Sequence, residues 1–366
     1  MVLAPPSASA SDATQATKDA AKVAVDAAFA TQVLFEALKS VVQQCKAGVK
    51  IVDICEHGDN FITEKIGQVY KNVKNTEKGI AFPTCISVNE VLCHFSPCSN
   101  CDQVLGENDI VKIDMACHIE DFTATVAHTL VISDGAVTGE AANALAAANT
   151  AADAALGLVR HGSKKKDVTE AIKEIAAAYN CEVSFRVSNA DTTLDDAEFE
   201  GNKLYVIDII TSTGSGEVNF DIDETNESNI DESTIYRKAA DQNSELTMKS
   251  SSFIFKEIDK RFPSKPFSLR WLEDKSRAFL GLTECVINGL LEPYPIMRDP
   301  ESTFTGHIKF TMLLMPNGPD RITSHQLQEL QPSMSIENND KIKGWVALGI
   351  KQMNRRKGKK KGNIQG

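Results

Sequence analysis

The sequence lacks the features that mark membrane-spanning or secreted proteins. No apolar run approaches the 18 or more residues that a bilayer-spanning helix needs. The first residues, MVLAPPSASASDATQ, have neither the basic start nor the apolar core of a secretory signal. Nine irregularly spaced cysteines form no disulfide pattern, and with no signal they are expected to be reduced thiols. We therefore expect a soluble intracellular protein without membrane contacts.

Acidic side chains are absent from the end of the chain. Residues 341–366 hold nine Lys or Arg and no Asp or Glu, so this tail carries a charge of +9. Residues 1–340 hold 30 basic and 50 acidic side chains, a net charge of −20. An acidic body with a basic tail predicts a polyanion-binding arm on an otherwise non-adhesive domain.

Hydrophobic periodicity predicts two long helices. Residues 1–15, rich in Ala, Ser and Pro, are expected to be disordered. Apolar residues at helical spacing then predict a helix from about Ala16 to Lys46, stopped by Gly48. A second Ala-rich helix is expected from about Glu140 to Arg160, stopped by Gly162.

The two helices begin an internal repeat. Three positions recur at an offset of 114 residues: Gly48, Asp53 and Glu56 return as Gly162, Asp167 and Glu170. Each aspartate is expected to N-cap a following helix. Each copy then reaches an apolar strand that is expected to end in Ile-Asp, at Asp114 and at Asp208, where the offset has fallen to 94. The second copy is thus about 20 residues shorter.

The shortening predicts the loss of a strand pair, with exposed sheet edges, from the second half. Either the fold compensates for this loss or the sequence is a mis-spliced version. Residues 219–300 interrupt the pattern and are expected to be a helical insertion, and GHIKFTMLLMP then predicts a strand closing into a turn at PNGP. The whole is expected to be α+β, with paired helices over curved, mostly antiparallel strands.

Several long segments, in order along nearly the whole chain, resemble one protein family. They are KGIAFPTCISVNEVLCHFSP (78–97), DIVKIDMACHIEDFTATVAHTLVI (109–132), KLYVIDIITSTGSGE (203–217), TIYRK (234–238) and IKFTMLLMPNGP (308–319). The sequence resembles the proliferation-associated, growth-factor-receptor-binding proteins, a non-peptidase branch of the methionine aminopeptidase superfamily (peptidase M24-like). That resemblance implies a pita-bread fold, which is itself an internally duplicated helix–strand unit.

The superfamily's peptidases bind two divalent metals through two Asp, one His and two Glu. Carried over by the resemblance, four of these positions fall on Asp114, Thr125, Asp208 and Lys309. The ligand His should precede Asp208, but no histidine occurs between His161 and His307. A hydroxyl and an ammonium thus replace two ligands, and we expect a Lys–Asp pair, no metal, no other cofactor and no peptidase activity.

Two further groups of residues have alternative interpretations. His94 matches the peptidases' substrate-contacting histidine and is interpreted as a structural remnant. Cys98 and Cys101 form a C-x-x-C that could be a zinc site or a redox pair, but no second such pair exists, and a loop with reduced thiols is the simpler interpretation.

The basic tail is the main candidate nucleic-acid-binding element. Its cations are Lys351, Arg355, Arg356, Lys357, Lys359, Lys360 and Lys361. Such a run binds phosphate backbone through counterion release and also serves as a nuclear or nucleolar address. Lys164, Lys165 and Lys166 could add phosphate contacts or merely complement the end of the preceding helix. Lys256, Lys260 and Arg261 of the insertion are further candidates.

We therefore expect a disordered N-terminus (1–15), a pita-bread domain (16–335, with the insertion at 219–300) and a basic, disordered tail (336–366). The resemblance implies a catalytically inactive aminopeptidase homologue that associates with ribosomes and structured RNA (rRNA), in the cytoplasm and the nucleolus. Its role would lie in ribosome biogenesis or in translational and growth control, and we expect a monomer. The alternatives are a protein-binding transcriptional co-regulator and a residual metallo-aminopeptidase.

Overall fold

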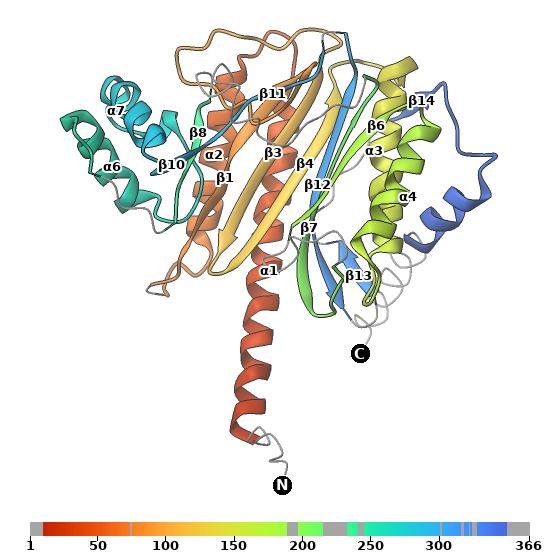
Figure 1. Cartoon of the computed structure of the whole chain (residues 1–366), viewed down its shortest axis with the longest axis horizontal. Coiled ribbons are helices and arrows are strands. Elements are labelled where there is room, and N and C mark those ends of the chain that lie inside the picture. The colour runs from red at the N-terminus through yellow and green to blue at the C-terminus, as the bar shows by residue number, and fades with distance from the viewer. Residues whose placement is uncertain are drawn as a thin grey trace.

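An antiparallel sheet of seven strands runs through the molecule in the order β1-β3-β4-β12-β7-β6, with β13 paired to β12 (Figure 1). The computed structural model describes residues 10–73, 75–188, 197–214, 233–240, 245–300, 302–315, 318–321, 323 and 328–349. The sheet strands are β1 (Lys78–Val88), β3 (Ile110–Ile119), β4 (Phe122–Val131), β6 (Glu182–Ser188), β7 (Lys203–Ser212), β12 (Thr305–Met315) and β13 (Gly318–Arg321). The expected mostly antiparallel α+β arrangement is therefore present.

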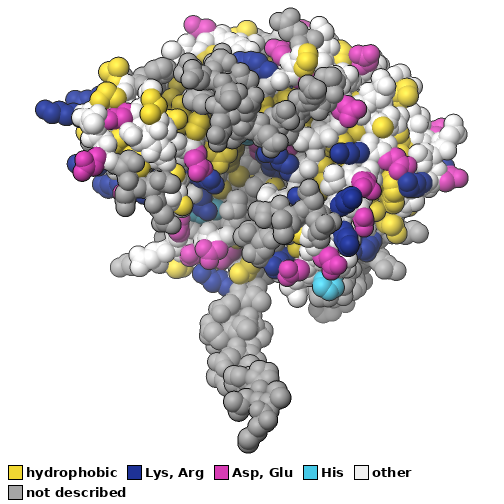
Figure 2. Space-filling model, viewed as in Figure 1, with side chains coloured by type: hydrophobic (Ala, Val, Ile, Leu, Met, Phe, Trp, Pro, Cys, Tyr) yellow, Lys and Arg dark blue, Asp and Glu magenta, His cyan; other side chains and the backbone are white. Residues whose placement is uncertain are grey.

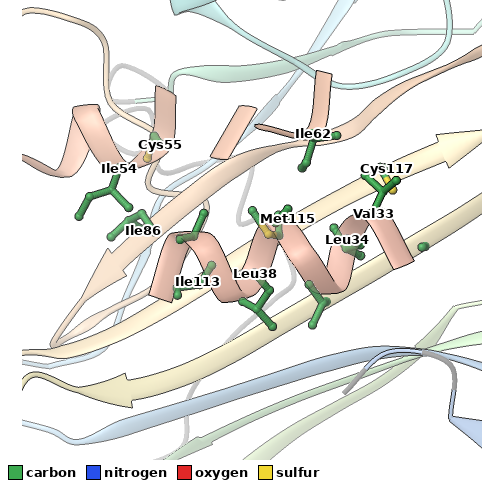
Figure 3. Close-up of a cluster of buried hydrophobic side chains, with 14 of the residues drawn as sticks. Val33, Leu34, Leu38, Ile54, Cys55, Ile62, Ile86, Ile113, Met115 and Cys117 are labelled. Atoms are coloured by element: carbon green, nitrogen blue, oxygen red, sulfur yellow. The ribbon is translucent and has the colours of Figure 1, made fainter. Parts of the chain in front are cut away.

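Two helix pairs cover one face of this sheet. They are α1 (Ala10–Gln44) with α2 (Ile51–Gln68), and α3 (Gly139–Leu158) with α4 (Lys165–Ala178). Strand alternation supplies the apolar surface: Ile113, Met115 and Cys117 of β3 pack with Leu34 and Leu38 of α1 (Figure 3). The second half repeats this packing, with alternate residues of β7 and β12 against α3 and α4. The first part of α1 extends beyond the sheet (Figure 1).

The internal repeat predicted from the sequence is present. Each half contributes two helices and three strands, and Gly48 and Gly162 share a left-handed conformation, with φ of 83° and 81°. Two details of the prediction were wrong. The N-caps of α2 and α4 are Lys50 and Lys164, without a side-chain cap, whereas Asp53 and Asp167 lie inside the first turn.

The boundaries of three elements differ from the prediction. The strands β3 and β7 continue past Asp114 and Asp208, because the residues after each aspartate keep the alternation of a buried strand. The helix α1 starts at Ala10, inside the stretch that was expected to be disordered, since its Ala-rich sequence favours helix. Residues 1–9 lie outside the described part.

The insertion between β7 and β12 is not purely helical. It holds two helices, α6 (Lys249–Arg261) and α7 (Lys275–Ile287), and the short 3-10 helix η1 (Leu269–Trp271). It also holds a three-stranded sheet of order β10-β8-β9, made of β10 (Leu291–Tyr294), β8 (Ile235–Lys238) and β9 (Phe267–Ser268). These strands were missed because each is too short to show a period of two. The strand β11 (Met297–Arg298) pairs with β2 (Val91–Cys93) of the first half.

A buried ion pair fastens the insertion to the first half. Arg270 of η1 donates from Nη2 to Asp59 Oδ2 of α2 over 2.5 Å, and both side chains are nearly fully buried. The indole of Trp271 donates to the same carboxylate over 2.9 Å, and the backbone N–H of Thr84 donates to its other oxygen. Because these three partners of the Asp59 carboxylate come from other elements, the carboxylate fixes where the insertion sits.

The segment that was expected to be a disordered tail begins with a docked helix. The strand β14 (Leu330–Pro332) pairs in parallel with β5 (Val137–Thr138), and residues 340–349 then form a helix beside α3 and α4 (Figure 1). Ile342 is fully buried there, and Gly157 of α3 has no room for a Cβ against Trp345 and Gly349. The boundary at 336 was therefore wrong, because apolar residues between the charges pack on α3. Residues 350–366 lie outside the described part.

The ion pair between Asp59 and Arg270 generates a stability prediction. The change Asp59→Asn leaves the Arg270 guanidinium buried without a counter-charge and should cost about 3–5 kcal/mol of unfolding free energy. Urea denaturation followed by circular dichroism measures this cost. The matched change Lys65→Gln removes a surface ion pair with Glu36 and a surface cation–π contact with Phe61, and should cost about 1 kcal/mol or less. Equal costs for the two variants would contradict the anchoring role.

Candidate functional site

One row of cross-strand neighbours brings the site residues together. In register across the sheet lie Asp114 (β3), Ala127 (β4), Lys309 (β12), Asp208 (β7) and Arg186 (β6). Their side chains point away from the face that α1 to α4 cover, because their strand neighbours fill the helix-side core. The four ionisable residues of this row thus share one cleft floor.

Lys309 is the centre of this row. Its ammonium lies 2.5 Å from Asp114 Oδ2 and 3.5 Å from Asp208 Oδ2. Asp114 is two strands away, and Lys309 reaches it because the residue between them, Ala127, has only a methyl side chain. The Lys–Asp pair expected from the sequence is present, and it engages both aspartates.

His307 belongs to the same network and was not predicted as a site residue. Its Nε2 lies 2.7 Å from Asp208 Oδ1, and its ring is almost fully buried. His307 precedes Lys309 by two residues on β12, so strand alternation places both side chains on the cleft side. This i, i+2 spacing beside a strand lysine was the available signal in the sequence.

The electrostatics of the row favour the charged forms of Asp208 and Lys309. Burial by itself raises the pKa of Asp208, but the ammonium of Lys309 and the hydrogen bond with His307 outweigh it and hold that pKa below its ordinary value. Burial likewise opposes the charge of Lys309, yet the carboxylates of Asp114 and Asp208 raise the pKa of Lys309 above its ordinary value. Lys309 is therefore an ammonium at physiological pH.

Thr125 lies on the same side of the sheet but is hydrogen-bonded to Thr311. Its backbone N–H donates to Thr311 Oγ1 over 2.9 Å, and the two hydroxyl oxygens are 3.3 Å apart. A dication between these strands needs negative oxygen ligands on several sides. Here it would meet a hydroxyl and an ammonium in place of two carboxylates, so the residues present do not fit a divalent metal pair.

His94 closes one end of the cleft in a strained conformation. Its φ is +67°, which is rare outside glycine, and its Nδ1 donates to the carbonyl of Pro295 over 2.9 Å. Burial, together with the charge of Lys309, lowers the pKa of His94 to about 4. The ring packs with Phe82 and Tyr294 at centroid distances of 5.8 and 5.4 Å. The neutral imidazole thus presents Nε2 as an acceptor to the cleft.

The cleft has a volume of about 790 Å³ and lies over strands of both halves of the sheet, beside the insertion. The five residues that the sequence singled out, His94, Asp114, Thr125, Asp208 and Lys309, all line it. One wall belongs to the insertion and carries Val286, Leu291 and Tyr294 together with the ion pair of Arg237 and Glu292. The opposite wall carries Arg186 and Ser188 of β6. A hollow with Lys and Arg side chains at its edges is visible near the centre of Figure 2.

The other candidate residues lie away from the cleft. Lys164 to Lys166 form the start of α4, next to the turn that follows α3. The basic residues of the tail fall outside the described part of the chain. Cys98 and Cys101 are half-buried, and within the described ranges no three His, Cys, Asp or Glu side chains gather as a metal site. In the same ranges, no helix has the length and apolarity to cross a membrane.

Comparisons with known proteins agree with this architecture. Residues 27–192 match the model of metallopeptidase family M24. The chain is 50% identical to ERBB-3 binding protein 1 of Solanum tuberosum, across 92% of this chain and 90% of that protein. It is 34% identical to Proliferation-associated protein A of Dictyostelium discoideum, across 88% of each.

A solved structure of a thermophilic Arx1 superimposes with a TM-score of 0.77 at 21% identity, covering 89% of this chain and 97% of that one. This likeness concerns the fold alone. With the M24 match it confirms the expected α+β, pita-bread architecture.

The row of charges predicts how the stability cost of removing Lys309 depends on pH. In the natural chain the stabilisation from Asp208 is complete above about pH 4 and is lost as pH falls further, because its folded pKa lies below its unfolded one. In Lys309→Met, Asp114 is buried without a counter-charge and Asp208 keeps only His307 and the neighbouring Arg186, so the cost should reach about 3–5 kcal/mol near neutral pH. That cost should shrink as pH falls towards about 5 and the carboxylates take up protons.

Urea denaturation at several pH values measures this difference. Lys341→Met is the matched control, since it removes an exposed pair with Glu174 and an exposed cation–π contact with Trp345. A Lys309→Met cost that stays constant with pH would show that the loss is one of packing.

A second prediction concerns metal. The double change Thr125→Asp with Lys309→Glu replaces the hydroxyl and the ammonium by carboxylates, so added Mn²⁺ or Co²⁺ should raise its Tm. At 100 times Kd the gain should be about 2.7 kcal/mol. The natural chain should show no shift with either ion in the same thermal scan. An equal shift in both proteins would contradict the assignment of Lys309 as the residue that excludes metal.

Proposed function

This chain belongs to the family of ERBB-3 binding protein 1 and Proliferation-associated protein A, within the M24-like superfamily, and from that membership we propose a catalytically inactive binding protein that associates with ribosomes and structured RNA. The single observation that carries the inactive assignment is the ammonium of Lys309 between Asp114 and Asp208. A metallopeptidase needs dications where this lysine forms its ion pairs.

The absence of activity is argued from charge and geometry together. The peptidase mechanism requires bridging carboxylates that neutralise two dications and hold a hydroxide. In this row the carboxylates of Asp114 and Asp208 already have a counter-ion, and Thr125 bonds to Thr311. Inductively coupled plasma analysis of the purified protein should find no stoichiometric divalent metal. Stoichiometric metal would favour the residual aminopeptidase instead.

Association with RNA is supported by where positive charge lies. The body of the chain is acidic, and the run from Lys351 to Lys361 is unopposed. Basic residues also gather around a second cavity of about 620 Å³ between the insertion and the first half, where Lys260, Arg261 and Lys265 meet Lys78. Such residues bind phosphate backbone without reading sequence. We propose rRNA as the partner, and a protein that moves between cytoplasm and nucleolus as a monomer.

Ribosome co-sedimentation over a salt series tests this function. We expect the full chain to pellet with ribosomes, and a version ending at Gly349 to bind more weakly and with a shallower dependence on salt. Each lost phosphate contact should lower the slope by about 0.7–0.9. The version should end at Gly349 and not at Asp340, because ending at Asp340 would also remove the helix docked on α3.

A full-length variant with the seven tail cations changed to Gln is the matched control, and it should behave like the truncation. Failure of every form to pellet at low salt would contradict ribosome association. The alternative of a protein-binding co-regulator is favoured by one relative's name, which states binding to ERBB-3. Partners that stay bound after nuclease treatment would support it.

A further inference from the structure

The two edge strands of the central sheet, β1 and β6, differ in what contacts their outer sides. At the β1 end, the chain returns along the strand: the N–H of Ile86 donates to the carbonyl of Phe95 over 2.8 Å, and Ser96 Oγ donates to the carbonyl of Thr84 over 2.7 Å. At the other end, β6 pairs with β7 on one side, and no described residue pairs with its outer side. Within the described part of the chain, the outer side of β6 therefore presents backbone N–H and C=O groups.

The chain that follows β6 is shorter than the chain that follows β1. In both halves a later segment pairs with the turn between the two helices: the N–H of Leu105 donates to Val49 O in the first half, and the N–H of Phe199 donates to Ser163 O in the second. From the edge strand to that segment there are 16 residues between Val88 and Leu105, but 10 between Ser188 and Phe199. The second half thus has fewer residues with which to cover its edge strand.

The side chains of β6 define what a covering strand would meet. Val183, Phe185 and Val187 pack on the helix-side core, although Val183 and Phe185 are only half-buried. On the other face, Arg186 and Ser188 line the cleft. A strand added beside β6 would therefore have apolar residues towards the helices and polar residues towards the cleft.

The cross-strand row also indicates the charge of that strand. From β3 outwards the ionised residues alternate as Asp114, Lys309, Asp208 and Arg186. Opposite charges on neighbouring strands stabilise a sheet, and like charges destabilise it. The position beyond the exposed Arg186 consequently favours an acidic residue.

We propose that the outer edge of β6 binds an extended segment of a partner polypeptide as an additional strand, alternating between apolar residues and polar residues that include an acid opposite Arg186. A peptide fits this edge because its backbone supplies donors and acceptors at the strand repeat, which a nucleic-acid backbone does not. The site is separate from the basic tail and does not depend on RNA binding.

Binding of a defined peptide tests the proposal. The probe is a dye-labelled heptapeptide, acetyl-Glu-Val-Thr-Val-Glu-Val-Thr-amide, measured by fluorescence anisotropy with the full chain. Two further versions carry N-methyl groups on alternate residues, so that each blocks one edge of the peptide. We expect one version to lose about tenfold or more in affinity, since several backbone hydrogen bonds are lost together, and the other to bind like the parent. Hydrogen exchange should show new protection at β6 amides when the parent peptide is bound.

A charge exchange gives the matched control. The peptide with Lys in place of Glu should bind the natural chain about 2- to 5-fold more weakly, and Arg186→Glu should reverse this preference by a similar factor. Arg186 is exposed, so the variant should keep its fold, which circular dichroism checks.

Three results would overturn the proposal. Equal loss with both N-methylated peptides, or no binding of any peptide, would exclude strand addition. Slow exchange of β6 amides in the free monomer would show that the chain covers its own edge. Protection that grows with protein concentration, together with a dimer in sedimentation, would identify a second copy as the occupant.

Discussion

Neutralising two buried carboxylates is the constraint on which the centre of this molecule depends. Asp114 and Asp208 sit on strands from the two halves, facing one cleft, and without a counter-charge they would repel each other across the sheet. Lys309 supplies that charge from β12, and Ala127 leaves the space through which its side chain reaches β3. The two halves of the duplicated fold are therefore joined at this point by an ion pair as well as by strand pairing. In this chain an ammonium therefore lies where two carboxylates face each other.

The remaining features follow from how two unequal halves were joined. The first half carries the insertion, held by Asp59 and Arg270, and the return segment that covers β1. The second half is shorter, ends in the edge strand β6 and carries the helix of residues 340–349 on α3. The cleft opens between these two sets of elements, so its walls differ: the insertion contributes apolar side chains and the pair of Arg237 and Glu292, and β6 contributes Arg186. The basic cavity proposed for polyanions and the strand edge proposed for a polypeptide belong to different elements.

Much of the fold was predictable because its helices and strands are long and periodic. The apolar spacing of α1 and α3 and the alternation in β3, β7 and β12 gave the right elements, and the family resemblance placed Asp114, Thr125, Asp208 and Lys309 in one cleft. The short strands of the insertion were missed because too few residues show a period. His307 was missed because its role depends on Asp208, which lies 99 residues away. The docking of the helix at 340–349 was missed because its charges suggested solvent, while Ile342 and Trp345 pack on α3.

The sequence by itself determined the pattern of residues within each strand, including a lysine and a histidine two positions apart on the same face of β12. It also determined the acidic body and the basic tail, since charge needs no fold. Only the tertiary structure decided which carboxylates Lys309 neutralises and which edge strand has no second partner among the described residues. The physical reason is that cross-strand neighbours are set by sheet order and register, and the order β3-β4-β12-β7-β6 brings together residues that no local spacing connects.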